Sequence, residues 1–173
     1  MKMFKKKTLI FLSLLTALSS FSQSLKKIAI GNSGCSLYSY CPLKIEMAPS
    51  KDSSIIYTGE CVSEAVSYGV ICVKLLHPRT DLSQAEELMV AYLDYLKASF
   101  DITSAAGYGK GHRLNNNENT RGILDYWEDK ERNKWKVKAW TDGKFIGVMY
   151  VFSKKELPES KVNVFLDSFR LPL

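Results

Sequence analysis

Three strand-like segments follow one another closely between residues 120 and 152, and this run restricts the fold more than any other feature. The segments are Thr120–Trp127, Lys134–Trp140 and Phe145–Phe152, with short polar turns between them. Connections this short join antiparallel strands, because parallel strands need a long crossover. Asp142-Gly143 also suits a type I′ hairpin turn. The sequence therefore predicts an antiparallel meander in this part of the chain.

A two-residue turn at Asp142-Gly143 would place Trp140 opposite Phe145 and Lys136 opposite Met149. Carried back through the preceding polar turn, the same register places Asp125 opposite Lys136, an oppositely charged pair that favours this pairing. One face of the meander would then be apolar core. The other would combine apolar and charged side chains: Ile123, Asp125, Trp127, Lys134, Lys136, Lys138, Trp140, Phe145 and Met149.

Five side chains of this second face, called the Trp/Lys face, form the candidate binding site. They are Trp127, Lys136, Lys138, Trp140 and Phe145. Lysine methylenes can lie on aromatic rings, so the face could bind an extended ligand, a peptide or a sugar. The alternative is structural: the C-terminal helix covers the apolar half, and the lysines reach solvent at its margin.

Helical patterns lie on both sides of the meander. Apolar residues recur every three or four positions from Ala85 to Phe100, which predicts an amphipathic helix capped by Asp81 or Ser83. Pro158 suits a helix start, and Val162 to Phe169 continues the C-terminal helix. Earlier strands are predicted at 43–47, 54–62 and 68–76. Together these elements predict one α+β domain, residues 23–173, in which an antiparallel sheet packs with a long central helix and a C-terminal helix.

The first 22 residues have the pattern of a secretory signal peptide. A basic start with Lys2, Lys5, Lys6 and Lys7 precedes a short apolar run, and small residues favour cleavage between Ser22 and Gln23. We expect a soluble secreted or periplasmic protein without a membrane span. Loss of those four lysines lowers the formal charge from +6 to +2, which argues against nucleic-acid binding.

Four cysteines in an exported chain favour two disulfides. Because neighbouring antiparallel strands bring facing residues within disulfide reach, we expect Cys35–Cys41 with Cys61–Cys72. The alternative is Cys41–Cys61 with Cys35–Cys72.

No catalytic constellation stands out in the sequence. His77 and His112 are isolated and lack metal-ligand spacing, so we expect no catalytic residue, metal or cofactor. A thiol enzyme would need a free cysteine beside one of these histidines. A small hydrolase using His112 remains an alternative from a different functional class.

The order of elements and the C-terminal segment Val164-Phe165-Leu166-Asp167-Ser168-Phe169-Arg170 resemble the PsbP-like α/β/α sandwich superfamily. The resemblance covers roughly residues 40–171, and the cysteines depart from its general pattern. It implies a non-enzymatic accessory role through protein contacts and transfers no functional residue. We therefore expect an exported protein that contacts a protein or cell-envelope partner through the Trp/Lys face. The other alternative is a binder of a small apolar ligand between sheet and helix.

Overall fold

The computed structural model describes residues 24–172, so the predicted leader and its cleavage site lie outside the described residues. The elements, in chain order, are β1 (Lys26–Ala29), β2 (Ser36–Ser39), β3 (Glu46–Pro49), β4 (Ile55–Ser63), β5 (Val66–Lys74), α2 (Leu82–Ser99), β6 (Ile102–Ala105), β7 (Gly109–His112), the short 3₁₀ helix η2 (Leu114–Asn116), β8 (Arg121–Asp129), β9 (Lys134–Thr141), β10 (Phe145–Ser153) and α3 (Glu159–Leu166). The predicted α+β class, with a long helix and a C-terminal helix, is confirmed.

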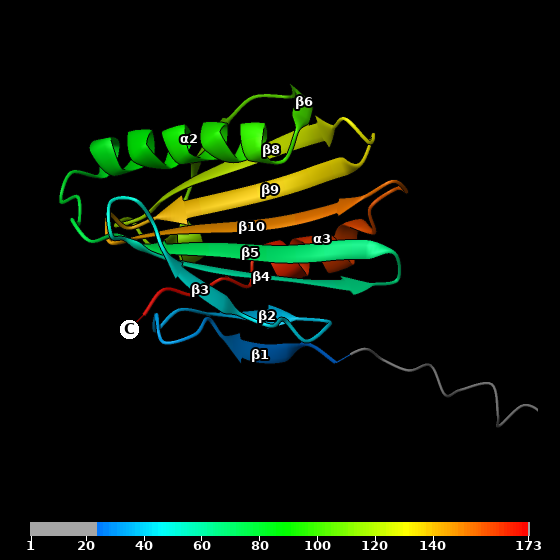
Figure 1. The fold of residues 1–173 in the computed structure, drawn as a ribbon, viewed down its shortest axis with the longest axis horizontal. Helices are drawn as coiled ribbons and strands as arrows, with labels where there is room; N and C mark the ends of the chain where they lie inside the picture. Colours follow the sequence, from blue (N-terminus) through cyan, green and yellow to red (C-terminus); the bar gives the residue numbers. More distant parts are fainter. Residues whose placement is uncertain (1–23, 173) are drawn as a thin grey trace, which may run out of the picture.

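A single antiparallel sheet forms the middle layer of the molecule. Its strands lie in the order β3-β4-β5-β10-β9-β8-β6, and β7 also pairs with β8. The helix α2 lies across one face of the sheet, and α3 lies behind the other face (Figure 1). A separate β1-β2 hairpin packs on the α3 side, where Ser36 of β2 bridges to Arg170 after α3.

Helix α2 forms because its apolar residues recur at helical spacing on one stripe. Ala85, Met89, Leu93 and Leu96 are the buried members of that stripe. Asp81 begins the helix, as predicted, by accepting a hydrogen bond from the Ser83 backbone N–H at 2.7 Å. The helix packs mainly on β9, β8 and β6, and its buried stripe shares one cluster with apolar residues of β5 and β10.

The opposite face carries the second core, built by α3 and the hairpin. Phe165, Phe169 and Leu37 are fully buried there. Gly147 of β10 permits this packing, because a Cβ at that position would lie 2.4 Å from the Phe169 ring. The chain after α3 is therefore held tightly against the centre of the sheet.

The β9-β10 turn is longer than the sequence predicted. Thr141 pairs with Ile146, and Trp140 pairs with Gly147 rather than with Phe145. The Asp142 side chain accepts hydrogen bonds from the backbone N–H groups of Lys144 and Phe145, and these contacts extend the turn. A shift of two residues keeps every β9 and β10 side chain on its predicted face.

The predicted register between β8 and β9 is wrong by one residue. Tyr126 rather than Asp125 lies opposite Lys136, and Asp125 lies opposite Val137. A shift of one residue moves every β8 side chain to the other face of the sheet. Asp125 pairs instead with Lys97 of α2, at 3.2 Å, so its charge is neutralised on the α2 side.

Candidate functional site

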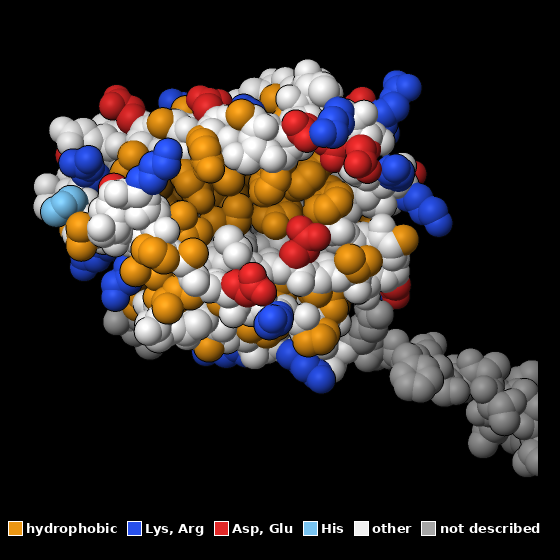
Figure 2. All heavy atoms as spheres, in the orientation of Figure 1, with side chains coloured by type: hydrophobic (Ala, Val, Ile, Leu, Met, Phe, Trp, Pro, Cys, Tyr) orange, Lys and Arg blue, Asp and Glu red, His pale blue; other side chains and the backbone are white. Residues whose placement is uncertain are grey.

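The hollow on the α2 side of the sheet is the principal candidate site. Figure 2 shows hydrophobic side chains gathered in a band below α2, with acidic side chains along the lower border of that band. The hollow encloses about 430 Å³ and is lined by Lys44, Glu46, Thr58, Gly59, Glu60, Ile71, Phe100 and Tyr150. Small-molecule sites occupy clefts of comparable size with mostly apolar linings. We call this site the α2-side hollow.

Three apolar side chains from three different elements line the α2-side hollow. Ile71 comes from β5 and Tyr150 from β10, while Phe100 follows the last turn of α2. The Phe100 ring lies 5.5 Å from the Tyr150 ring and 5.1 Å from the Trp135 ring, measured between centroids. This aromatic cluster fixes one wall of the hollow, because each ring restricts the others.

Tyr150 and Glu60 place polar atoms at the margin of the apolar surface. The Tyr150 hydroxyl donates a hydrogen bond to the Glu60 carboxylate at 3.1 Å. Burial and the nearby Glu60 charge raise the pKa of Tyr150 far above its usual value, so the phenol stays neutral. The Tyr150 ring lies directly over Gly69, where a Cβ would be only 2.1 Å from the ring, so this position needs glycine. The pair can exchange hydrogen bonds with a ligand's polar end.

The rim of the α2-side hollow carries a small net negative charge. Glu46 forms an exposed ion pair with Lys44 at 3.5 Å, and such pairs contribute little to stability. Glu60 has the neutral Tyr150 hydroxyl as its partner. A ligand would therefore meet three apolar side chains together with two carboxylates, of which Glu46 is paired with Lys44 and Glu60 is not paired with a cation.

The aromatic residues of the predicted Trp/Lys face are buried and divided between the two cores. Trp127 lies on the α2 side because of the β8 register, and its indole N–H donates to Asp125 at 2.6 Å. Trp140 and Phe145 lie in the α3-side core. The five candidate residues therefore do not form one exposed surface.

The two lysines of that face pair with α3 and the residue after it. Lys136 Nζ donates to Glu159 at 2.9 Å and to Asn163 at 3.0 Å, and only 7 % of its side chain is exposed. Burial lowers the pKa of Lys136, but Glu159 and Tyr126 outweigh that effect and raise it overall. Lys138 pairs with Asp167. This arrangement corresponds to the structural alternative, in which the C-terminal helix covers the face.

An accessible groove lies beside Lys136, and we call it the Tyr126 groove. It encloses about 420 Å³ between β6, the ends of β8 and β9, and the segment that leads into α3. Tyr126 is 46 % exposed, and Lys136 Nζ lies 5.4 Å from its ring centroid. The sequence could not indicate this groove, since the predicted register turned Tyr126 into the core.

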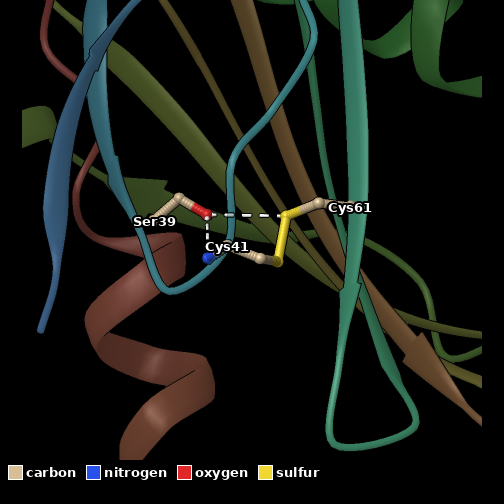
Figure 3. The surroundings of a disulfide bond; sticks show 3 residues. All are labelled: Ser39, Cys41 and Cys61. Carbon is tan, nitrogen blue, oxygen red and sulfur yellow. Dashed lines mark hydrogen bonds between the residues drawn. A yellow bond between two sulfur atoms is a disulfide. The ribbon is translucent and has the colours of Figure 1, made fainter. Parts of the chain in front are cut away.

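The structure changes the predicted disulfide pairing. Cys41 and Cys61 are linked, with Ser39 beside them (Figure 3). The expected pairs Cys35–Cys41 and Cys61–Cys72 are wrong here, because Cys61 lies opposite Tyr68 in the β4-β5 register, and Cys72 lies opposite Tyr57. Cys41 lies in the turn after β2, not in a strand beside Cys61. The observed bond belongs to the alternative pairing.

Cys35 and Cys72 are free and buried, whereas His77 and His112 are exposed. An exposed imidazole does not supply the base that a buried thiol would need for catalysis. Within residues 24–172, no group of three or more histidine, cysteine or acidic side chains is placed to hold a metal ion. No helix in that range is long and apolar enough to cross a bilayer.

No protein-family model matches the chain, and no curated protein matches it. The similarity to the PsbP-like superfamily therefore stays a prediction. The α2-side hollow, the Tyr126 groove and the four cysteines are the features from which function can be argued.

Proposed function

We propose that this protein is an exported, non-enzymatic binding protein that holds a small apolar ligand in the α2-side hollow. The observation that carries the proposal is the uneven cover of the sheet. Helix α2 packs on β9, β8 and β6, while the hollow opens over Ile71 of β5 and Tyr150 of β10. Ile71 and Tyr150 are almost fully buried at the base of the hollow, so the half-buried Phe100 ring is the main apolar surface that a ligand would remove from water.

The lining sets the chemistry that a ligand needs. Ile71, Phe100 and Tyr150 offer aliphatic and aromatic contacts. The Tyr150 hydroxyl and the Glu60 carboxylate offer a hydrogen-bonding pair at one margin. A neutral or weakly cationic amphipathic molecule matches this arrangement, because an anion would be placed beside Glu60.

Export is supported by the predicted leader and by the Cys41–Cys61 disulfide. Disulfides persist in secreted and periplasmic proteins and are rare in the reducing cytosol. Export would place the α2-side hollow among the apolar molecules of the cell envelope.

Binding of the neutral apolar dye Nile red, measured by its fluorescence, tests the proposal. Thr58 is exposed and lines the hollow, so the ring introduced by Thr58→Phe should fill part of it. We expect saturable dye binding by the wild type and an affinity about tenfold lower in the variant, equivalent to about 1.4 kcal/mol.

Val62→Phe is the matched control for Thr58→Phe. Val62 lies on the same strand and face, is 65 % exposed, and does not line the α2-side hollow. Its dye affinity should stay close to that of the wild type. No saturable dye binding by the wild type, or equal affinity in all three proteins, would contradict the proposal.

The Tyr126 groove supports a second candidate function, contact with a protein or cell-envelope partner. It lies beside Lys136 of the predicted Trp/Lys face, and its main feature is the exposed ring of Tyr126, a residue that the sequence placed in the core. Tyr126→Ala should weaken retention of the protein on isolated cell envelopes. Tyr95→Ala, at a tyrosine that is 64 % exposed on α2, should not. Equal retention of the two variants would eliminate this candidate.

A further inference from the structure

Two free cysteines lie in the α3-side core. Cys35 lies between β1 and β2 and is 2 % exposed, and Cys72 of β5 is fully buried. Both side chains belong to the same buried cluster, and each thiol shifts the pKa of the other. They come from segments that are far apart in the chain, so their contact depends on docking of the β1-β2 hairpin against the sheet.

The turn of the hairpin lies close to Cys72. Gly31 has a positive φ of 55°, and a Cβ at this position would lie 2.8 Å from the Tyr57 ring. Tyr57 is the neighbour of Cys72 in the β4-β5 register, and its hydroxyl donates to the Asn32 side chain at 2.6 Å. The turn is therefore seated on Tyr57, beside Cys72.

Ser33 then fixes the chain that carries Cys35. Its hydroxyl donates to the Ile30 carbonyl at 2.6 Å and accepts from the Cys35 backbone N–H at 3.0 Å. The Ile30 N–H donates to the Cys35 carbonyl at 2.9 Å. These contacts fix the backbone of Cys35 within the buried cluster that also contains Cys72, the other free cysteine of residues 24–172.

We infer that Cys35 and Cys72 form a second disulfide in the exported protein, which locks the β1-β2 hairpin to the central sheet. The reaction joins the two sulfur atoms and removes one proton and one electron from each thiol. The electron acceptor is the disulfide of a thiol-oxidising protein, which takes up two electrons and two protons and becomes a dithiol. No atom of the oxidant remains in the product.

Burial determines when this reaction takes place. The interaction between the two thiols raises the pKa of Cys72 and lowers that of Cys35, but in the folded protein both sulfurs are buried. Disulfide exchange requires direct contact between a thiolate and the sulfur of the oxidant, and burial prevents that contact. The bond should therefore form while the hairpin is still undocked, during folding after export.

Disulfide mapping of the full chain, expressed with its leader and isolated without reductant, tests the inference. Free thiols are blocked with N-ethylmaleimide before digestion. Trypsin alone cannot settle the pairing, because Cys35 and Cys41 share one tryptic peptide and Cys61 and Cys72 share another. Further cleavage after Tyr40 by chymotrypsin and after Glu60 and Glu64 by a glutamate-specific protease separates all four.

We expect a peptide pair joined through Cys35 and Cys72, in the same molecules that contain Cys41–Cys61. The Cys41–Cys61 bond serves as the internal control, because it shows that those molecules met an oxidant. Blocked Cys35 and Cys72 in molecules with an intact Cys41–Cys61 bond would overturn the inference. So would linkage of either cysteine to any other partner.

A double variant gives a second, independent measurement. Cys35→Ala with Cys72→Ala removes the proposed bond and leaves Cys41–Cys61 intact. We expect its midpoint of thermal unfolding, without reductant, to lie about 10 °C below that of the wild type. Reduction should lower the midpoint of the wild type much more than that of the double variant. Equal effects of reductant on both proteins would contradict the inference.

Discussion

The indole of Trp140 lies parallel to the ring of Phe169, with the centroids 6.1 Å apart, and is 3 % exposed. Tyr126, on the same side of the sheet, is 46 % exposed. Two aromatic side chains of neighbouring strands thus differ in what they contribute. Trp140 stabilises the contact with the segment after α3, while Tyr126 offers its ring to solvent or to a partner.

This difference predicts the effect of truncating each ring. Trp140→Ala should lower the free energy of unfolding by about 3–5 kcal/mol, because it opens a cavity in a closed core. Tyr126→Ala should change it by less than about 1 kcal/mol. Urea denaturation of both variants measures the two values. A small loss for Trp140→Ala would mean that this indole is not part of the core.

The turn between β8 and β9 is held by one carboxylate. Asp129 accepts hydrogen bonds from the backbone N–H groups of Glu131 and Asn133, both at 2.9 Å. It also accepts from the Asn133 amide at 2.8 Å and from the Trp135 indole at 2.9 Å. Burial raises the pKa of Asp129, but these hydrogen bonds outweigh burial and lower it. The ionised form is therefore the one that stabilises the hairpin.

Asp129→Asn should consequently destabilise the protein in a pH-dependent way. A carboxylate whose pKa is lowered by folding stabilises above its ordinary value of about 4, and that contribution is lost as the pH falls further. At neutral pH we expect a loss of about 1–3 kcal/mol. Unfolding free energies from pH 7 to 2 should fall more steeply for the wild type below about pH 4. Parallel curves would show that Asp129 does not act through its charge.

The elements were predictable where periodicity was long and clear, as in α2 and in β8, β9 and β10. The short strands β2 and β6 were missed, because Ser36–Ser39 and Ile102–Ala105 lie beside segments rich in glycine, serine or asparagine. The predicted register of β8 was wrong because it was chosen to place Asp125 opposite Lys136 as an ion pair. The true partner, Lys97, lies in a helix whose position the strands do not reveal.

The candidate sites were less predictable than the fold. Burial of Trp140 and Phe145 depends on where α3 docks, and the sequence left that open as one of two alternatives. The α2-side hollow depends on which strands α2 covers. Its lining joins Glu46, Thr58, Ile71, Phe100 and Tyr150 from five separate segments, and only the strand order brings them together.

At the scale of the whole molecule, the two faces of the sheet are covered differently. The α3 side is closed by α3, by the β1-β2 hairpin and by the chain that follows α3, and the Cys41–Cys61 bond ties the turn after β2 to β4. The α2 side has one helix over one part of the sheet (Figure 1). The closed α3 side stabilises the fold, and the α2 side contains the hollow in which we propose that a ligand binds.

Methyl NMR of the full mature protein, with isoleucine δ-methyl groups labelled, tests this account most directly. Ile71 lines the α2-side hollow, and Ile30 is fully buried in the α3-side core, so each methyl group reports on one face. Titration with Nile red should shift the Ile71 resonance progressively and leave that of Ile30 unchanged. An unchanged Ile71 resonance at dye concentrations that saturate binding, or a shift confined to Ile30, would contradict the proposed site.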